Sequence, residues 1–336
     1  MNGSANDAQA PEASPQSAPE ASPQPYLVTV GETLAVLSAA EPGPLAMGTE
    51  LRLGIAGAES NVAVGVSRLG GRATWIGRVS EDQLGELVLR ELRAEGVTAL
   101  AVRDPAPTSL LLKERRTGTH HRMRYYRTAT AGVRLAPQDI PEQVVAGAAV
   151  LHLTGITPAL GDAPASAVRR AVRIARDAGV LVSFDINFRS LLWSEEDARR
   201  AVLPLLRDSD LVFAGPHEAR LVVPDLREPE ELAKGLCELG PGGAVVKLGA
   251  EGAYALLDGV PYRQPALPVR VHDSVGAGDA FVAGYLAELL AGEEPERRLR
   301  TAARLGAFAV TTAGDWEGLP RRTELALLDH HDDVLR

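Results

Sequence analysis

His272-Asp273-Ser274-Val275-Gly276-Ala277-Gly278-Asp279-Ala280-Phe281 is the stretch that decides how the rest of this chain is interpreted. It lies between a proline-punctuated extended segment, Pro261 to Val271, and a run of apolar periodicity, Ala280 to Leu290. This placement predicts a loop that opens a helix. The two glycines let the backbone approach a ligand, and the first N–H groups of a helix attract anions. Asp279 is placed where it can accept a proton from a hydroxyl group beside a bound anion.

Two interpretations of this stretch are open from the residues alone. A Gly-x-Gly turn before a helix is also an ordinary tight turn, and Asp279 then only complements the helix dipole. The whole stretch, however, resembles the Asp-Thr-x-Gly-Ala-Gly-Asp-x-Phe signature of the ribokinase-like (PfkB) carbohydrate kinases, with Ser274 in place of Thr. The resemblance implies that Gly276, Ala277 and Gly278 form the anion hole for the transferred phosphoryl group. It also implies that Asp279 is the catalytic base and that Ser274 belongs to the ATP site.

Composition limits the classes of protein to consider. The chain has 336 residues, 45% of them hydrophobic, which is enough for a substantial core in one large domain. The formal net charge of -9 argues against a nucleic-acid partner. Cys237 is the only cysteine, no apolar run is long enough to span a bilayer, and the start of the chain lacks the features of a signal peptide. We therefore expect a cytoplasmic protein without a membrane partner.

Two regions of different composition divide the chain. Residues 1–25 are rich in Pro, Ala, Ser and Glu, and the hexapeptide Pro-Glu-Ala-Ser-Pro-Gln occurs in them twice. Such a segment buries too little apolar surface to become ordered, so we expect a disordered tail. Residues 26–336 are predicted to form the folded domain. Strand and helix patterns alternate through most of it, which predicts an α/β fold with a mostly parallel sheet.

A predicted hairpin interrupts this alternation. Thr108 to Arg115 and His121 to Arg127 are two extended runs with no helix between them, which indicates a lid. The resemblance implies a ribokinase-like domain of three α/β/α layers, covered by a small β-sheet lid drawn from about residues 32–56 and 98–130. Ligands of open parallel sheets bind beyond the carboxyl ends of the strands, and the candidate polar residues follow predicted strand ends.

Three further segments match motifs of the same family. Gly57 and Asn61 lie in a segment that resembles its Gly-Gly-x-x-x-Asn-x-Ala motif, which implies sugar contacts, although Asn61 could equally cap a helix. Lys247, Gly249 and Gly252 match a Lys-x-Gly-x-x-Gly segment whose turn covers the nucleotide, although on its own this pattern also fits an ordinary hairpin.

The third segment departs from the family pattern. The motif Asn-x-x-Glu has Gly215 in the place of Asn, and only Glu218 is carried over. The resemblance implies that Glu218 takes part in Mg²⁺ binding through water, which agrees with the tendency of this ion to keep several waters. An exposed carboxylate at a helix start is the alternative for this residue.

Substrate choice is expected to depend on residues outside the signature. Arg127 and Arg189 follow strand ends, and a pair of guanidinium groups suits a carboxylate, although most arginines are solvated on a surface. The pattern resembles one branch of the family, the 2-keto-3-deoxygluconate kinases, from residue 26 to about 320. This resemblance implies substrate contacts from Gly57, Tyr126, Arg127, Arg189 and Asp315.

The expected activity is therefore ATP-dependent phosphorylation of the terminal hydroxyl of 2-keto-3-deoxygluconate. Asp279 is expected to be ionised at neutral pH, since a helix N-terminus favours the anion. The resemblance implies ATP, Mg²⁺ and optionally a monovalent cation as cofactors, and a homo-oligomer formed through the lid. Two alternatives remain: a kinase of the same fold acting on fructose, ribose or a nucleoside, and a non-catalytic sugar or nucleotide sensor. The residues do not distinguish the gluconate from the galactonate configuration.

Overall fold

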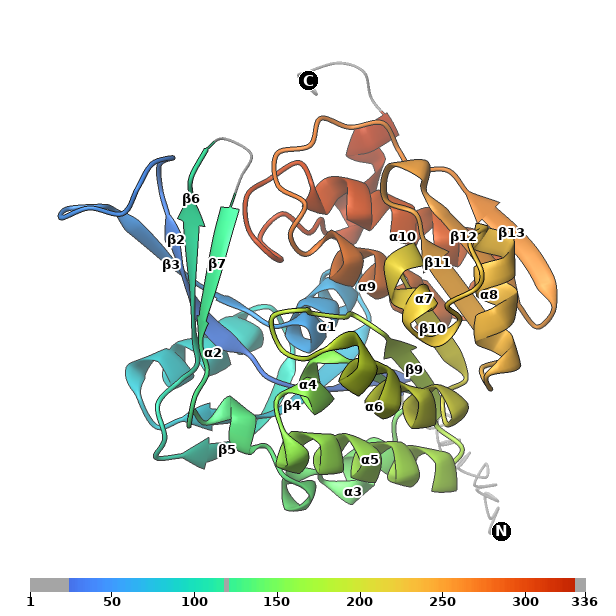
Figure 1. Ribbon diagram of the computed structural model, residues 1–336, viewed down its shortest axis with the longest axis horizontal. Helices are drawn as coiled ribbons and strands as arrows, with labels where there is room; N and C mark the ends of the chain where they lie inside the picture. Colours follow the sequence, from blue (N-terminus) through green and yellow to red (C-terminus); the bar gives the residue numbers. More distant parts are fainter. Residues whose placement is uncertain (1–23, 118–120, 330–336) are drawn as a thin grey trace, which may run out of the picture.

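The computed structural model describes residues 24–117 and 121–329 (Figure 1). Most of the tail expected at residues 1–25 lies outside the described residues, as do 118–120 of the hairpin turn and 330–336. Two sheets make up the β-structure of the described part. Figure 1 shows the smaller sheet standing to one side of the larger α/β body. No helix in the described ranges has both the length and the apolar character needed to cross a membrane.

The larger sheet is mostly parallel and has the strand order β13-β12-β11-β10-β9-β8-β1-β4-β5. Only its last two strands in sequence, β12 and β13, pair antiparallel with their neighbours. The predicted α/β fold with a mostly parallel sheet is confirmed. The nine strands are β1 Tyr26–Val30, β4 Arg72–Ser80, β5 Thr98–Asp104, β8 Val150–Thr154, β9 Leu181–Asp185, β10 Leu211–Ala214, β11 Gly243–Lys247, β12 Ala253–Leu257 and β13 Val260–Gln264.

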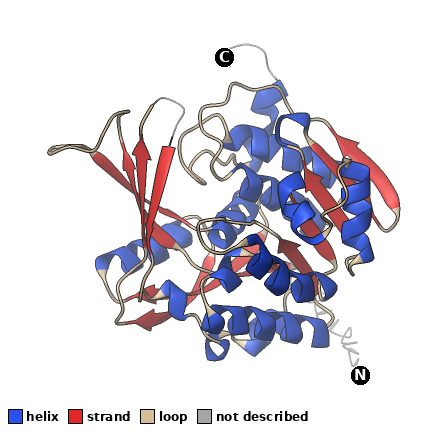
Figure 2. Ribbon diagram, in the orientation of Figure 1, coloured by secondary structure: helices blue, strands red, loops and turns tan. Residues whose placement is uncertain are grey.

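Helices cover both faces of this sheet (Figure 2). Successive side chains of a strand point to opposite faces, and in β10 Phe213 belongs to one apolar cluster while Val212 and Ala214 belong to the other. Both clusters are fully buried, which explains why these strands are continuous apolar runs. One face carries α1 Ala58–Arg68, α2 Gln83–Ala94, α9 Ala277–Leu290 and α10 Pro295–Ala309, and the other α5 Asp162–Asp177, α6 Glu195–Arg207, α7 Pro216–Val222 and α8 Pro229–Glu238.

The smaller sheet, called the lid below, has the strand order β3-β2-β6-β7. Its register puts Val36, Leu111 and Tyr125 in one row, so these side chains share a face. We call this face, which also carries Lys113 and Met123, the inner face. The four strands are β2 Leu34–Ala39, β3 Leu51–Ala56, β6 Leu110–Arg115 and β7 His121–Tyr126.

Three predicted boundaries were wrong. The segment 98–104 is β5, which pairs with β4 at the edge of the large sheet, so the second part of the lid begins at Leu110. The extended segment predicted from Pro261 to Val271 forms a strand only as far as Gln264, since the stretch from Pro265 contains a second proline and forms no ladder. Helix α9 begins at Ala277, inside the glycine turn, because Gly276 at φ 75° already serves as its N-cap.

Candidate active site

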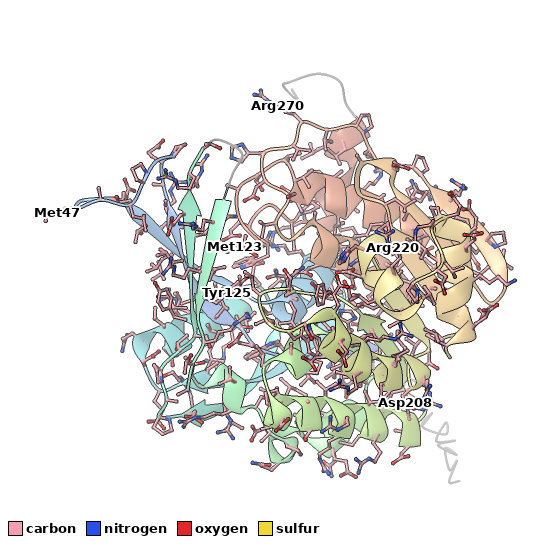
Figure 3. The ribbon with its side chains drawn as sticks, viewed as in Figure 1. Met47, Met123, Tyr125, Asp208, Arg220 and Arg270 are labelled. Atoms are coloured by element: carbon pink, nitrogen blue, oxygen red, sulfur yellow. The ribbon has the colours of Figure 1, made fainter. Side chains whose placement is uncertain are left out.

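A cavity of about 1110 Å³ lies between the lid and the α/β body. Figure 3 shows Met123 and Tyr125 on the part of the lid next to the body, whereas Met47 lies at the outer tip (Figure 3). Apolar side chains of the inner face line the lid side of the cavity: Leu34, Ala56, Leu111, Met123 and Tyr125. The body side carries every residue of the stretch from Ser274 to Asp279. The cavity therefore joins the two parts of the fold at the signature.

The glycine turn at the start of α9 is shaped by close backbone packing. Gly276 has φ 75°, and a Cβ at this position would lie 1.9 Å from the carbonyl oxygen of Asp315. Only glycine tolerates both conditions. The turn therefore presents the unpaired N–H groups at the start of a fourteen-residue helix to the cavity, as an anion hole requires.

Asp279 is a buried carboxylate in the first turn of α9, with 7% of its surface exposed. The side-chain amide of Asn61 donates to its Oδ2 at 2.8 Å, and that of Asn187 donates to its Oδ1 at 3.2 Å. Burial raises the pKa of Asp279, while Arg189 and the hydrogen bond from Asn61 oppose this shift. The expectation of full ionisation from the helix dipole overlooked this cost of burial. A carboxylate with a raised pKa and fixed orientation is suited to accept a proton.

The two amides reach Asp279 from different elements. Asn61 lies in α1, and its Oδ1 accepts a hydrogen bond from the N–H of Gly57 at 3.4 Å. Asn187 follows β9 and has φ 40°, a conformation that few residues other than glycine adopt but that asparagine tolerates. Backbone strain of this kind is often retained where a side chain must be aimed. Both residues hold the carboxylate in place, and both also line the cavity.

Lys247 at the end of β11 lies beside the glycine turn. Its Nζ donates to Oδ2 of Asp185 at 2.6 Å and would lie 3.5 Å from a Cβ on Gly278. Burial by itself would lower the pKa of Lys247, but Asp185, Glu218 and Asp279 together raise it. A charged ammonium group therefore faces the turn of Gly276 to Gly278. Lys247 was expected only in the turn that covers the nucleotide, so it lies nearer to the expected anion hole than that role requires.

Glu218 in the first turn of α7 holds two backbone N–H groups. Its Oε2 accepts from Gly215 at 2.6 Å, and its Oε1 accepts from Phe188 at 3.0 Å. Each carboxylate oxygen has a second lone pair, so Glu218 can still accept a water of a hydrated ion, and it lines the cavity. Among the described residues, no group of three His, Cys, Asp or Glu side chains forms a direct metal site. The donor set fits Mg²⁺ bound through water.

Arg127 lies at the lid end of the cavity. Its Nε forms an ion pair with Oε2 of the buried Glu32 at 2.8 Å, and its guanidinium lies 4.3 Å from the ring centroid of Tyr125. These two contacts fix the plane of the guanidinium group. Tyr126, which was expected to contact substrate, is 50% exposed and does not line the cavity. The expectation missed the strand alternation, which turns Tyr125 inward and Tyr126 outward.

Arg189 and Asp315 complete the polar lining. Arg189 is exposed, lines the same cavity as Arg127, and forms no ion pair within the described ranges. Burial raises the pKa of Asp315 to about 7, and Lys113 opposes the shift. The segment that carries Asp315 is held by Arg68, whose guanidinium donates to three carbonyl groups, those of Trp316, Glu317 and Leu319.

Small residues form another part of the cavity lining. Gly249 at φ 59° and Gly252 at φ 98° form the turn after Lys247, and both line the cavity. Three small residues of α10 that share a helical face also line it: Ala303, Gly306 and Ala307. Such a surface leaves space for a flat ring. Ser274, which was expected in the ATP site, also lines the cavity.

Several residues of the site were not predicted as site residues. Asp185 stands at the end of β9, so its position could have indicated it, whereas Asn187 was a candidate only through its place after a strand end. Glu59 and Lys113 give no signal in the sequence. Glu59 is a buried carboxyl group on α1 whose Oε1 accepts hydrogen bonds from Thr154 and Thr157, each at 2.7 Å. Burial raises the pKa of Glu59 to about 7, and Asp279 adds to this shift.

The fold and the site together define an α/β protein of the ribokinase-like class, in which a lid covers a carboxylate at a helix N-terminus. The model of the pfkB family of carbohydrate kinases matches residues 24–322. The chain belongs to this family.

Curated relatives extend over most of the chain. The 2-dehydro-3-deoxygluconokinase of Thermoproteus tenax is 38% identical over 89% of this chain and 92% of its own length. That of Bacillus subtilis is 36% identical over 89% of this chain and 94% of its own length. The 2-dehydro-3-deoxygalactonokinase of Haloferax volcanii is 35% identical over 86% of this chain and 92% of its own length.

Solved structures share the architecture. A PfkB protein from Polaromonas sp. superposes with a TM-score of 0.81 at 35% identity, over 89% of this chain and 98% of that one. A protein from Escherichia coli described as a ribokinase II, in complex with ATP and Mg²⁺, superposes with a TM-score of 0.83 at 25% identity, over 91% of this chain and 99% of that one. The chain is a sugar kinase, and ATP with Mg²⁺ is the cofactor pair that its relatives bind.

Replacing Glu59 by Gln tests the raised pKa of this carboxyl group. Between the ordinary value of 4.5 and about 7, the folded state keeps a proton that the unfolded state has lost. The free energy of unfolding therefore falls as pH rises through this window, by on the order of 3 kcal/mol. Glu59→Gln should remove that part of the pH dependence, measured by urea unfolding at pH 5 and pH 7.5. Glu238→Gln, at an exposed position on α8, is the control, and equal pH dependence in all three proteins would contradict the assignment.

Proposed function

We propose that this kinase transfers the terminal phosphoryl group of ATP to the terminal hydroxyl of 2-dehydro-3-deoxygluconate, also called 2-keto-3-deoxygluconate. The observation that carries the proposal is Asp279, held by two amides at the start of α9 inside a cavity that two arginines also line. The names of the relatives in Thermoproteus and Bacillus support the same substrate.

The reaction follows from the placement of three groups. Asp279 accepts the proton of the substrate hydroxyl while the hydroxyl oxygen attacks the terminal phosphorus of ATP; the bond from this phosphorus to the bridging oxygen breaks, and ADP leaves. The N–H groups at Gly276 to Gly278 stabilise charge on the transferred group, and the ammonium of Lys247 adds a positive charge on the same side. The lid over the cavity excludes water, which limits hydrolysis of ATP.

Glu218 is the residue that we propose to hold the hydrated Mg²⁺, and Asp185 lies near it around the same lysine. When bound, the ion neutralises charge on the phosphate groups. The family resemblance also implies a monovalent cation as an optional cofactor, and we assign no step of the reaction to it. Because ATP is made inside cells and the chain has a single cysteine, we also propose that the protein works in the cytoplasm.

Arg127 and Arg189 are the groups proposed to bind the carboxylate of the substrate. Arg127 is already oriented by Glu32 and Tyr125, so little conformational freedom is lost on binding. Arg189 has no competing ion pair in the described part of the chain and is available to a ligand. Tyr125 packs beside the sugar in this arrangement, in place of Tyr126, while Gly57 and Asp315 remain proposed sugar contacts.

Asp279→Asn tests the catalytic base. The amide keeps the size of the side chain but cannot accept the proton, so kcat should fall by about 1,000-fold. The measurement is ADP release with 2-keto-3-deoxygluconate, ATP and Mg²⁺. Asp177→Asn, at an exposed position of α5, should leave the rate unchanged. A rate within threefold of wild type in Asp279→Asn would contradict the mechanism, whereas no phosphoryl transfer by the wild type would favour the sensor alternative.

Arg189→Ala tests the preference for an acid. Loss of a charge-assisted contact to a carboxylate costs roughly 1.5–3 kcal/mol, so kcat/KM for 2-keto-3-deoxygluconate should fall by about 10- to 100-fold. The value for fructose should fall by a smaller factor, because a neutral sugar has no such contact and is affected only through the influence of Arg189 on Asp279. Arg200→Ala, exposed on α6, is the matched control.

A panel of substrates separates the remaining alternatives. It includes the galactonate epimer, fructose, ribose and adenosine, each at saturating ATP. A wild-type kcat/KM higher for a neutral sugar or nucleoside than for both acids would contradict the proposed substrate. A higher kcat/KM for the galactonate epimer would leave the proposed role of the two arginines unchanged. It would alter only the configuration of the proposed substrate.

The outer face of the lid supports a second proposal, that two copies of the chain associate there. The register places six apolar side chains on this face across all four strands. Leu53 is 53% exposed and Tyr126 is 50% exposed. A contiguous exposed apolar face of this kind is typical of an interface. The six are Leu37, Leu51, Leu53, Leu110, Leu112 and Tyr126.

Leu53→Glu tests the association through the lid. A charge at the centre of an apolar interface is left unpaired, so the dimer should dissociate to monomers at micromolar concentration. Light scattering after size-exclusion chromatography measures the mass. Val260→Glu, on β13 at an edge of the larger sheet, should leave the dimer intact. A monomeric wild-type protein would contradict the proposal.

A further inference from the structure

A buried ion pair joins the lid to the signature loop. Lys113 lies on the inner face of β6, and its Nζ donates to Oδ2 of Asp273 at 2.5 Å. The two side chains are each 5% exposed. Burial of two charges is costly, so a pair of this kind is a weak source of stability. Its retention between two separate parts of the fold calls for a reason other than stability.

Asp273 connects this pair to the anion hole. Its Oδ1 accepts a hydrogen bond from the N–H of Val275 at 3.2 Å, so the carboxylate bridges the lid lysine and the backbone next to Gly276. The backbone around Asp273 is anchored on the other side as well, since the N–H of His272 donates to the carbonyl of Val310 at 2.7 Å. Lys113 is therefore linked to the backbone of the turn through the carboxylate of Asp273.

Asp315 lies in the same group of charges. It lines both the main cavity and a small cavity of about 120 Å³, which Lys113 and Asp273 also line. Its carbonyl oxygen is the atom against which Gly276 packs. Lys113 thus interacts with two carboxylates, those of Asp273 and Asp315.

We propose that Lys113 is a positioning residue for phosphoryl transfer: its ammonium group, carried on the lid, holds Asp273 and thereby the turn that presents the N–H groups of Gly276 to Gly278. The anion hole is complete only while the inner face of the lid lies against the loop. This inference rests on the proposed phosphoryl transfer and adds a residue that contacts neither substrate. It also links closure of the lid to competence of the anion hole.

Kinetics of Lys113→Met test this role. Methionine keeps most of the volume but not the charge, and the loss affects stabilisation of the transition state more than binding of the sugar. We expect kcat to fall by about 100-fold while KM for the sugar stays within about twofold. Lys113→Arg keeps the charge and should retain a rate within about tenfold of wild type. Lys234→Met, exposed on α8, should behave as wild type.

A double variant keeps the test decisive if the single variant does not fold. Lys113→Met with Asp273→Asn removes both buried charges, and the amide oxygen can still accept from Val275. We expect this protein to fold, with a thermal midpoint near that of wild type, and to keep the low kcat. A wild-type kcat in the double variant, or a kcat within about threefold of wild type in Lys113→Met, would overturn the inference.

Chemical rescue gives an independent reading. In Lys113→Ala, methylammonium chloride can restore a cation beside Asp273, whereas tetramethylammonium chloride at the same ionic strength is too large for the space. We expect at least a tenfold recovery of kcat with the first salt alone, and equal rates in the two salts would count against the role of the charge. Failure of the proposed function is distinguished by the wild type, which would then transfer the phosphoryl group to another sugar in preference or to no sugar at all.

Discussion

The active site is arranged around one buried carboxylate, which lies where a glycine turn becomes a helix. Asp279 loses most of its water, which raises its pKa, and the amides of Asn61 and Asn187 fix both of its oxygens. These two amides come from α1 and from the end of β9, so the helix layer that carries α1 and α9 and the sheet beneath it must both be in place before the carboxylate is oriented. A base in this position is useful only because the surrounding fold holds it.

Charge around this carboxylate is balanced by cations that come from separate elements. Lys247 at the end of β11 faces the turn from the body, Arg189 lowers the pKa of Asp279, and Lys113 reaches the signature loop from the lid. Each cation has a different task in the proposed mechanism: stabilising the phosphoryl group, binding the sugar acid, and positioning the loop. Their convergence explains why a protein with a net charge of -9 can bind two anionic ligands in one cavity.

The lid acts through two different faces. Its inner face contributes apolar side chains to the cavity and Lys113 to the signature loop, and its outer face carries the apolar surface proposed for association. Because successive residues of a strand point to opposite faces, one strand can serve both tasks, and neighbouring residues such as Tyr125 and Tyr126 differ in role. If two copies associate through the lid, the position of one lid affects the other, and through Lys113 also the anion hole.

The sequence by itself determined the fold class, the glycine turn with Asp279, and the family, because these depend on local patterns: strand and helix periodicity, positive φ at glycine, and a contiguous motif. Pairings between distant residues were decided only by the tertiary structure. Lys113 meets Asp273 across 160 positions, Asn61 meets Asp279 across 218, and the burial that raises the pKa of Glu59 comes from packing against several elements. Desolvation and long-range contacts depend on the whole fold, and a short stretch of residues carries no record of them.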